Sequence, residues 1–138
     1  MSDYETFLQL FYYMLKRMKK EWSNNLKGIN HTQYLILKYL NQLGPQKAVQ
    51  LAELTQMTPG AITGATDRIV AEGYAERKGD KEDRRVVYLE ITEQGKTLVE
   101  SLAKEQNEVT MKFFQGLPGE DMQHLVRIYH KIMDNLEQ

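Results

Sequence analysis

The chain has 138 residues, of which 41% are hydrophobic, a length and composition typical of one domain with a buried core. Its formal net charge of -1 argues against a generally basic nucleic-acid coat protein, and the absence of cysteine excludes disulfides, thiolate metal ligands and a cysteine nucleophile. No apolar run is long enough to span a bilayer and the N-terminus lacks a secretion signal, so we expect a cytoplasmic protein without membrane contact.

The first predicted element is a long N-terminal helix at about residues 3–24. Apolar and aromatic residues recur at steps of three or four from Tyr4 to Trp22, which places them on one face of the helix. A basic cluster lies on the same segment and consists of Lys16, Arg17, Lys19 and Lys20. The apolar stripe needs a partner, which is either another part of this chain or a second copy of it.

The second predicted helix follows at about residues 30–44. Asn30 can cap it and Gln33 can complete a capping box. Gly44 and Pro45 then end the helix. Its apolar positions predict a largely buried element.

Residues 48–73 are predicted to form two short helices around a tight turn. Thr58 suits the N-cap of the second helix and Pro59 its first position. The outward face of this helix is small and polar and carries Gly60, Thr63, Gly64, Asp67, Arg68 and Ala71. Each glycine costs about 1 kcal/mol relative to alanine in an exposed helix, a cost that is explained if the backbone must approach another surface.

The next segment is predicted to be a hairpin with a charged tip. The runs YAERK and RVVYLEI have strand-like composition, and GDKEDR separates them. Five cations and three acids stand between Arg77 and Arg85, which gives this stretch a net charge of +2. A chain that is nearly neutral overall thus concentrates positive charge on one small turn.

Two further helices complete the chain. Thr92 can cap the first of them, and Gly116 and Pro118 interrupt it. The last helix carries an apolar stripe from Met122 to Leu136. Together with the N-terminal stripe, these residues exceed what a small winged domain needs for its own core, which favours pairing between two chains; an intramolecular four-helix packing is the alternative.

The order helix, turn, helix, cationic hairpin is the layout of a winged helix-turn-helix, in which the second helix fits the major groove and the hairpin reaches the adjacent backbone or minor groove. The predicted fold is therefore mainly α with a small β-hairpin wing, flanked by N- and C-terminal dimerisation helices. We expect one domain over residues 1–138. Its DNA-binding winged helix covers about 30–92, and its dimerisation helices cover about 3–24 and 93–136.

Residues 51–95 resemble the MarR family of bacterial transcription regulators. The matching positions are Leu51, Ala52, Thr63, Asp67, Arg68, Gly73, Tyr74, Arg77, Asp83, Arg85, Thr92 and Gly95. The resemblance implies an obligate homodimer that binds a pseudo-palindromic operator in double-stranded DNA and acts as a ligand-responsive repressor. Gly64 stands where family members often carry a larger residue, so no base preference is carried over at that position.

The predicted DNA-binding residues lie on the second short helix and on the hairpin. They are Thr58, Pro59, Gly60, Thr63, Gly64, Asp67, Arg68, Lys81, Asp83, Arg84 and Arg85. We expect Asp83 to hold Arg85 in place for insertion into the minor groove, whose narrow A·T-rich stretches attract arginine. Lys81 and Arg84 are expected to meet phosphates. An ordinary solvated charged turn is the alternative.

The family resemblance also implies a small aromatic or lipophilic effector bound between the dimerisation helices and the DNA-reading part. The residues in the corresponding segments are Tyr12, Trp22, His31 and Tyr34. An aromatic stripe at helical spacing is also typical of a core. We predict no cofactor and no metal, because His31, His124 and His130 lack the spacing of a shared site on one helix face.

Two other classes of function compete with a DNA-binding repressor. The first is a winged-helix adaptor that binds protein only, and a transcription activator is a variant of the main prediction. The second is an enzyme, but the chain has no phosphate loop, dinucleotide fingerprint or HExxH motif and no convincing nucleophile-base arrangement, so we predict no catalytic residues.

Overall fold

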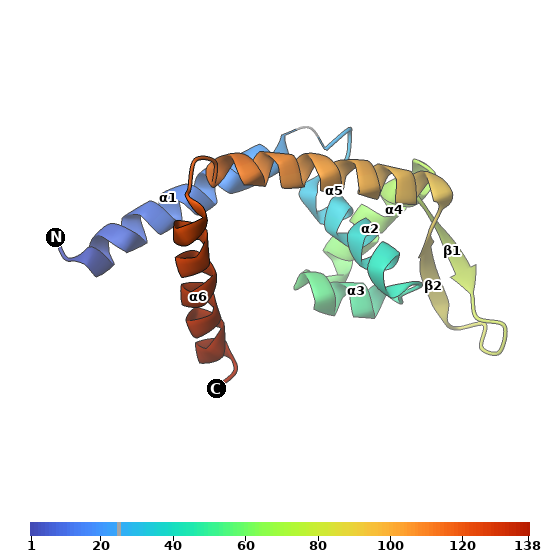
Figure 1. The fold of residues 1–138 in the computed structure, drawn as a ribbon. Coiled ribbons are helices and arrows are strands. Elements are labelled where there is room, and N and C mark those ends of the chain that lie inside the picture. The colour runs from blue at the N-terminus through green and yellow to red at the C-terminus, as the bar shows by residue number, and fades with distance from the viewer. Residues whose placement is uncertain (25) are drawn as a thin grey trace.

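The computed structural model describes residues 1–24 and 26–138. Its helices are α1 (Asp3–Ser23), α2 (His31–Leu43), α3 (Ala48–Thr55), α4 (Pro59–Ala71), α5 (Glu93–Phe113) and α6 (Gly119–Leu136), and its strands are β1 (Ala75–Gly79) and β2 (Val87–Ile91) (Figure 1). The prediction of a mainly helical chain with one small hairpin is confirmed. No helix in the described part of the chain combines the length and apolar character that a membrane crossing needs.

The helix ends lie where the capping residues predict them. The Asn30 side chain accepts a hydrogen bond from the Gln33 amide at 2.8 Å, and the Gln33 side chain accepts one from the Asn30 amide at 2.8 Å. Thr58 accepts from the amide of Ala61 at 3.2 Å, with Pro59 directly after it in the first helical position. The start of α4 is thus defined by a bond between residues three positions apart and does not depend on contacts with distant residues.

The core lies between α2, α3, α4, the hairpin and the first half of α5. Its fully buried large side chains are Ile36, Leu37, Leu40, Leu51, Ile62, Ile69 and Leu102. Leu98 and Val99 of α5 are also buried in this core. The segment predicted as dimerisation helices from residue 93 onward therefore begins with a half-helix that belongs to the winged part.

Close packing joins the start of α5 to the end of α4. A Cβ atom at Gly95 would lie 2.1 Å from the Tyr74 carbonyl oxygen, so only glycine fits there. The Thr92 amide donates to the same carbonyl at 3.0 Å, and the Thr92 hydroxyl donates to the Gly73 carbonyl at 2.7 Å. Gly73 itself has a φ of +84°, which favours glycine. The orientation of α5 relative to α4 is thus set by direct backbone contact.

The hairpin pairs antiparallel from Ala75 opposite Ile91 to Gly79 opposite Val87. A further pairing was not predicted from the sequence. Gln46 and Leu89 exchange two backbone hydrogen bonds of 3.0 and 2.8 Å, which attach the segment before α3 to β2. This bridge holds the wing against the helices.

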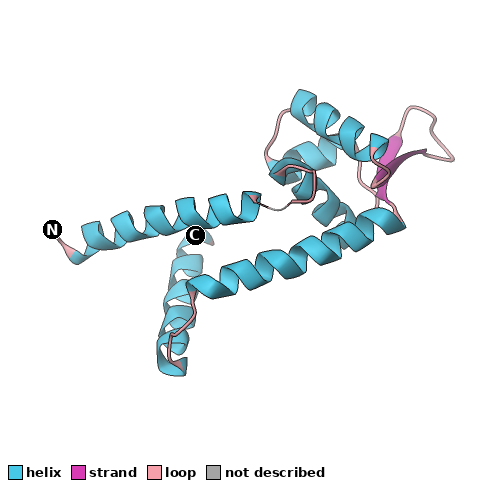
Figure 2. Ribbon diagram, turned by 90° about the horizontal axis from the view of Figure 1, so that it is seen from above, coloured by secondary structure: helices cyan, strands magenta, loops and turns pink. Residues whose placement is uncertain are grey.

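The two terminal helices extend away from the core. In Figures 1 and 2 the N-terminus and the hairpin lie at opposite ends of the molecule. The first half of α1 is largely exposed, including Tyr4, Phe7 and Leu10. Helix α6 has no buried residue over its 18 positions, although its sequence is strongly amphipathic. Much of the apolar face of α6 and of the first half of α1 is consequently uncovered in a single chain, whereas Met18 in the second half of α1 is buried.

Candidate nucleic-acid interface

The outward face of α4 is open to solvent, as the helical wheel predicts. Ile62 and Ile69 are fully buried, whereas Thr63, Asp67 and Arg68 on the other side are exposed. The Thr63 hydroxyl bonds the carbonyl one turn earlier, at Pro59, over 3.0 Å. The exposed face of α4 is thus polar, as the sequence predicts.

The two glycines of α4 have no packing role within the chain. A Cβ atom at Gly60 or Gly64 would meet nothing within 4 Å. Each glycine weakens the helix by about 1 kcal/mol relative to alanine. No neighbour in the described part of the chain requires a glycine at either position.

A salt bridge connects α4 to the wing. The Asp67 carboxylate pairs with the guanidinium of Arg77 on β1. Asp67 was predicted as a DNA-binding residue, whereas Arg77 was counted among the cations of the hairpin and the positions that match the family but not among the DNA-binding residues. The pair cancels the negative charge that Asp67 would otherwise present to DNA phosphates, and it fixes the distance between helix and strand.

Arg68 has a different contact. Its Nη2 atom donates a hydrogen bond of 3.1 Å to the carbonyl oxygen of Gly28, in the loop between α1 and α2. This residue was also predicted to bind DNA. The hydrogen bond of Arg68 is therefore to the loop between α1 and α2 and not to the wing.

At the wing tip Asp83 holds Arg85. The guanidinium of Arg85 donates to both carboxylate oxygens of Asp83, at 3.2 and 3.3 Å, and its amide donates at 3.0 Å. The side-chain hydrogen bonds from Arg85, and after them its backbone hydrogen bond, hold the pKa of Asp83 below its usual range. The Arg85 side chain is 90% exposed. The predicted Asp83–Arg85 arrangement is present, with the arginine presented to solvent.

The remaining charges of the wing divide into paired and unpaired cations. Lys78 pairs with Glu90 at 3.1 Å, which raises the pKa of the lysine. Lys81 and Arg84 form no ion pair with the part of the chain that the structure describes. Asp80 and Glu82 form no ion pair with the described residues either, so residues 80–85 carry three cations and three acids. Phosphate contact by Lys81 and Arg84 therefore depends on where these two side chains lie and not on a net positive charge of the tip.

A small cavity lies between the second short helix and the wing. It has a volume of about 280 Å³, and its lining includes Thr63 and Thr66 of α4, Arg77 of β1 and Tyr88 of β2. The Lys47 ammonium lies 5.8 Å from the centre of the Tyr88 ring, a cation–π distance. Lys47, Arg77 and Tyr88 were not among the predicted site residues. Arg77 and Tyr88 reach the cavity beside Thr63, and Lys47 reaches Tyr88, only through the packing of the hairpin.

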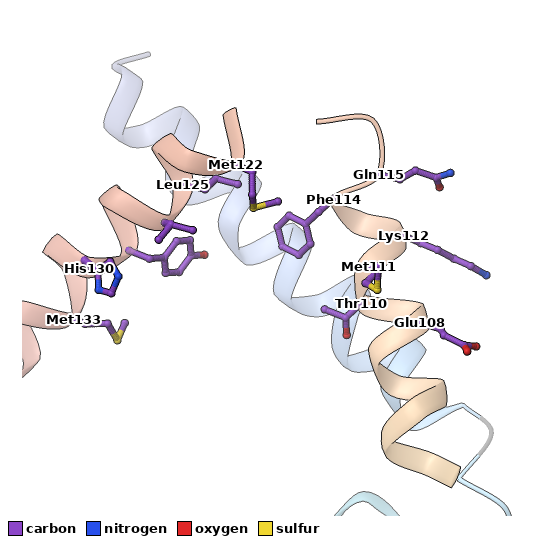
Figure 3. Close-up of a pocket in the computed structure, with 12 residues that line it drawn as sticks. Glu108, Thr110, Met111, Lys112, Phe114, Gln115, Met122, Leu125, His130 and Met133 are labelled. Carbon is purple, nitrogen blue, oxygen red and sulfur yellow. The ribbon is translucent and has the colours of Figure 1, made fainter. Parts of the chain in front are cut away.

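A larger apolar cleft separates the end of α5 from α6. It has a volume of about 950 Å³, and its lining includes Met111, Phe114, Met122, Leu125, Tyr129 and Met133. In Figure 3 Phe114 and Met122 face each other across this cleft, while Lys112 and Gln115 point away from it. Sequence reasoning did not predict this cleft, because the angle between the two helices depends on the turn at 114–118.

The predicted effector residues do not gather around one cavity. Tyr12 and His31 are exposed, and Tyr34 is buried in the core, where burial raises its pKa. The Trp22 ring nitrogen donates to the Thr110 hydroxyl at 2.8 Å. None of the four lines the small cavity beside the wing or the apolar cleft between α5 and α6. Their role in effector binding stays a prediction.

The part of the chain that contains this interface is similar to a known protein family. Residues 29–87 match the family model described as "MarR family". That span begins two residues before α2 and ends at the first residue of β2, so it contains α4 and the charged tip. The family match therefore rests on the elements that form the candidate interface.

Relatives and solved structures extend the similarity over nearly the whole chain. The HTH-type transcriptional repressor MdtR of Bacillus subtilis is 26% identical over 142 residues, which cover 99% of this chain and 88% of that protein. A MepR-like protein crystallised with pseudoligands is 33% identical, with 96% of this chain and 94% of that chain covered and a TM-score of 0.63. Streptococcus pneumoniae FabT in complex with DNA is 19% identical, with 98% of each chain covered, and shares the fold at a TM-score of 0.83.

Proposed function

Since the chain belongs to the MarR family, it is a transcription regulator that binds DNA and not an enzyme, and we propose that it acts as a homodimer on a pseudo-palindromic operator. The observation that carries this proposal is the open face of α4 beside a wing whose Arg85 is held by Asp83 and exposed. The major groove admits an α-helix, and a small polar face such as that of α4 can approach base edges. Arg85 is the group suited to a narrow minor groove.

Pairing between two chains is supported by the uncovered helices. An 18-residue amphipathic helix with no buried residue is marginal in water, because most helical stability in proteins comes from packing of the apolar face. Exposed aromatic residues on α1, such as Phe7 and Tyr13, need cover as well. A second copy supplies both partners at once and relates two reading helices by a two-fold axis. The FabT–DNA structure shows that this fold, in that protein, binds DNA.

Selection of bound fragments from random DNA tests the proposal. We expect enrichment of an inverted repeat whose half-sites lie about 10–10.5 base pairs apart, or a multiple of that, because each chain presents one α4 to the major groove. Sequencing of the bound pool and footprinting measure the spacing. Enrichment of a single unrepeated motif would contradict the dimeric operator, and no enrichment at all would favour an adaptor that binds only protein.

The regulator is proposed to respond to a small aromatic or lipophilic effector and to repress transcription. Support comes from MdtR, which is named a repressor, and from the MepR-like protein, which was crystallised with pseudoligands. In this chain Trp22 is the sole tryptophan and lies at the contact between α1 and α5. Its fluorescence therefore reports on the region in which we predict the effector to bind.

A screen of phenolic and lipophilic compounds tests this response. An effector should change Trp22 fluorescence and weaken operator binding together, by about 5- to 150-fold, which corresponds to about 1–3 kcal/mol of coupling. Run-off transcription should fall when the protein is added and recover with the effector. A rise in transcription would indicate an activator, and a library in which no compound moves both signals would argue against ligand control.

A further inference from the structure

We propose that Arg68 and Lys27 form a joint that fixes α4 relative to α1 and α5, so that Arg68 is a positioning residue for DNA binding and not a phosphate contact. The inference rests on the proposed DNA binding for its effect on affinity. The joint itself consists of contacts within one chain and can be tested without DNA.

Two adjacent residues tie α4 to separate parts of the molecule. Asp67 pairs with Arg77 of the wing. Arg68, the next residue, donates to the Gly28 carbonyl at 3.1 Å, a contact between residues 40 positions apart. Helix α4 is therefore attached to the wing by one side chain and to the loop between α1 and α2 by the next.

The loop that offers this carbonyl is itself held by α5. Lys27 and Gly28 have φ values of +53° and +91°, and the left-handed region is uncommon for a lysine. The Lys27 ammonium donates to the Ser101 hydroxyl at 2.6 Å and lies 3.3 Å from a Glu105 carboxylate oxygen. These two contacts explain why Lys27 keeps its unusual backbone conformation, and they set the position of the neighbouring Gly28 carbonyl.

Helix α5 also holds the end of α1. The Gln106 side chain donates to the Trp22 carbonyl at 2.8 Å, and the Trp22 ring donates to Thr110 at 2.8 Å. Ser101 and Glu105 thus contact the loop, and Gln106 and Thr110, further along α5, contact the end of α1. A shift of α1 along α5 would move the Gly28 carbonyl, and through Arg68 it would move α4.

The rival explanation is that Arg68 leaves the loop and binds a phosphate. The two roles differ in what they require of the side chain. A phosphate contact needs positive charge near the backbone and displaces counterions, so it contributes to the salt dependence of binding. A bond to the Gly28 carbonyl needs the planar guanidinium at a defined place, which a lysine does not reproduce.

The test uses the full-length protein with Arg68→Met, Arg68→Lys and Lys27→Met, and with Arg84→Met as the matched control. Arg84 is an exposed wing arginine without an ion pair to the described residues. Hydrogen exchange of the DNA-free dimer over residues 26–30 should quicken several-fold in the Arg68 and Lys27 variants and stay unchanged in Arg84→Met. This readout reports on the joint alone.

Operator affinity against salt concentration gives the second readout. Arg68→Met and Arg68→Lys should both weaken binding about tenfold with an unchanged slope, and combining Arg68→Met with Lys27→Met should add little further loss. Arg84→Met should instead lower the slope by about 0.9 for each phosphate that the arginine neutralises in the wild type.

Three results would show that Arg68 and Lys27 do not form this joint. They are unchanged hydrogen exchange over residues 26–30 in the Arg68 and Lys27 variants, a reduced salt slope in Arg68→Met, and full operator affinity in Arg68→Lys. If Arg68→Met does not fold, Lys27→Met alone decides by the same measures. Failure of the wild type to bind DNA would refute the proposed function and leave the exchange result to judge the joint.

Discussion

Replacing Met133 by aspartate should give a folded monomer of 16.1 kDa that has lost tight operator binding. Met133 lies in the last turn of the α6 stripe and lines the apolar cleft with Phe114. A carboxylate buried there in a dimer would lack a partner, and desolvation of an unpaired charge is strongly unfavourable. Two linked half-site contacts exceed one by about 10²–10⁴ in affinity, so the monomer should lose a comparable factor. Light scattering and fluorescence anisotropy on labelled DNA measure the two effects.

Lys131→Asp is the control for this variant. Lys131 lies on the face of α6 opposite the stripe, since two positions along a helix turn by about 200°. It changes the net charge by twice as much as Met133→Asp does, yet it should leave the protein dimeric. A Met133→Asp protein that stays dimeric and binds DNA normally would refute α6 as part of the interface.

Replacing Arg85 by alanine should weaken operator binding by about 1–3 kcal/mol in each half-site, because each chain contributes one Arg85. The side chain is 90% exposed and held by Asp83, so its removal should leave the fold intact. The salt dependence should also flatten, because an arginine near the backbone displaces counterions. Fluorescence anisotropy at several salt concentrations measures both quantities, and circular dichroism checks the fold.

Thr63→Ala should behave differently from Arg85→Ala. Thr63 is an uncharged group on the exposed face of α4, so its loss should alter base preference and leave the salt slope nearly unchanged. Selection with each variant protein measures the preference. If Arg85→Ala keeps full affinity and full slope in a properly folded dimer, the wing is an ordinary solvated turn.

Local signals account for the parts of the fold that the sequence predicted well. Asn30 with Gln33, and Thr58 with Pro59, act within one helical turn, and the structure shows their bonds where they were expected. Amphipathic periodicity likewise separated the two faces of α4. Such features depend on neighbours three or four residues away, and one sequence contains that information.

Contacts between distant residues could not be predicted in the same way. Asp67 and Arg68 look alike in the sequence as exposed charges, yet one bonds the wing and the other bonds Gly28. Periodicity also cannot tell which apolar residues of a long helix belong to the core of their own chain. On α5 Leu102 is fully buried, whereas Phe113 near the end is only half-buried. These differences are set by the packing of whole elements.

The backbone contact between Gly95 and Tyr74 makes α5 a lever. With 21 residues, α5 is about 31 Å long, and its first turn is attached directly to the segment that follows α4. A tilt of about 6° at its far end would therefore displace the reading helix by about 3 Å, close to the rise of one base pair along a DNA strand. If α5 tilted in opposite directions in the two chains of a dimer, the distance between the two reading helices would change by twice that displacement. An effector bound between the dimerisation helices and the DNA-reading part would need to alter the inclination of α5 by only a few degrees to put the second reading helix out of step with its half of the operator.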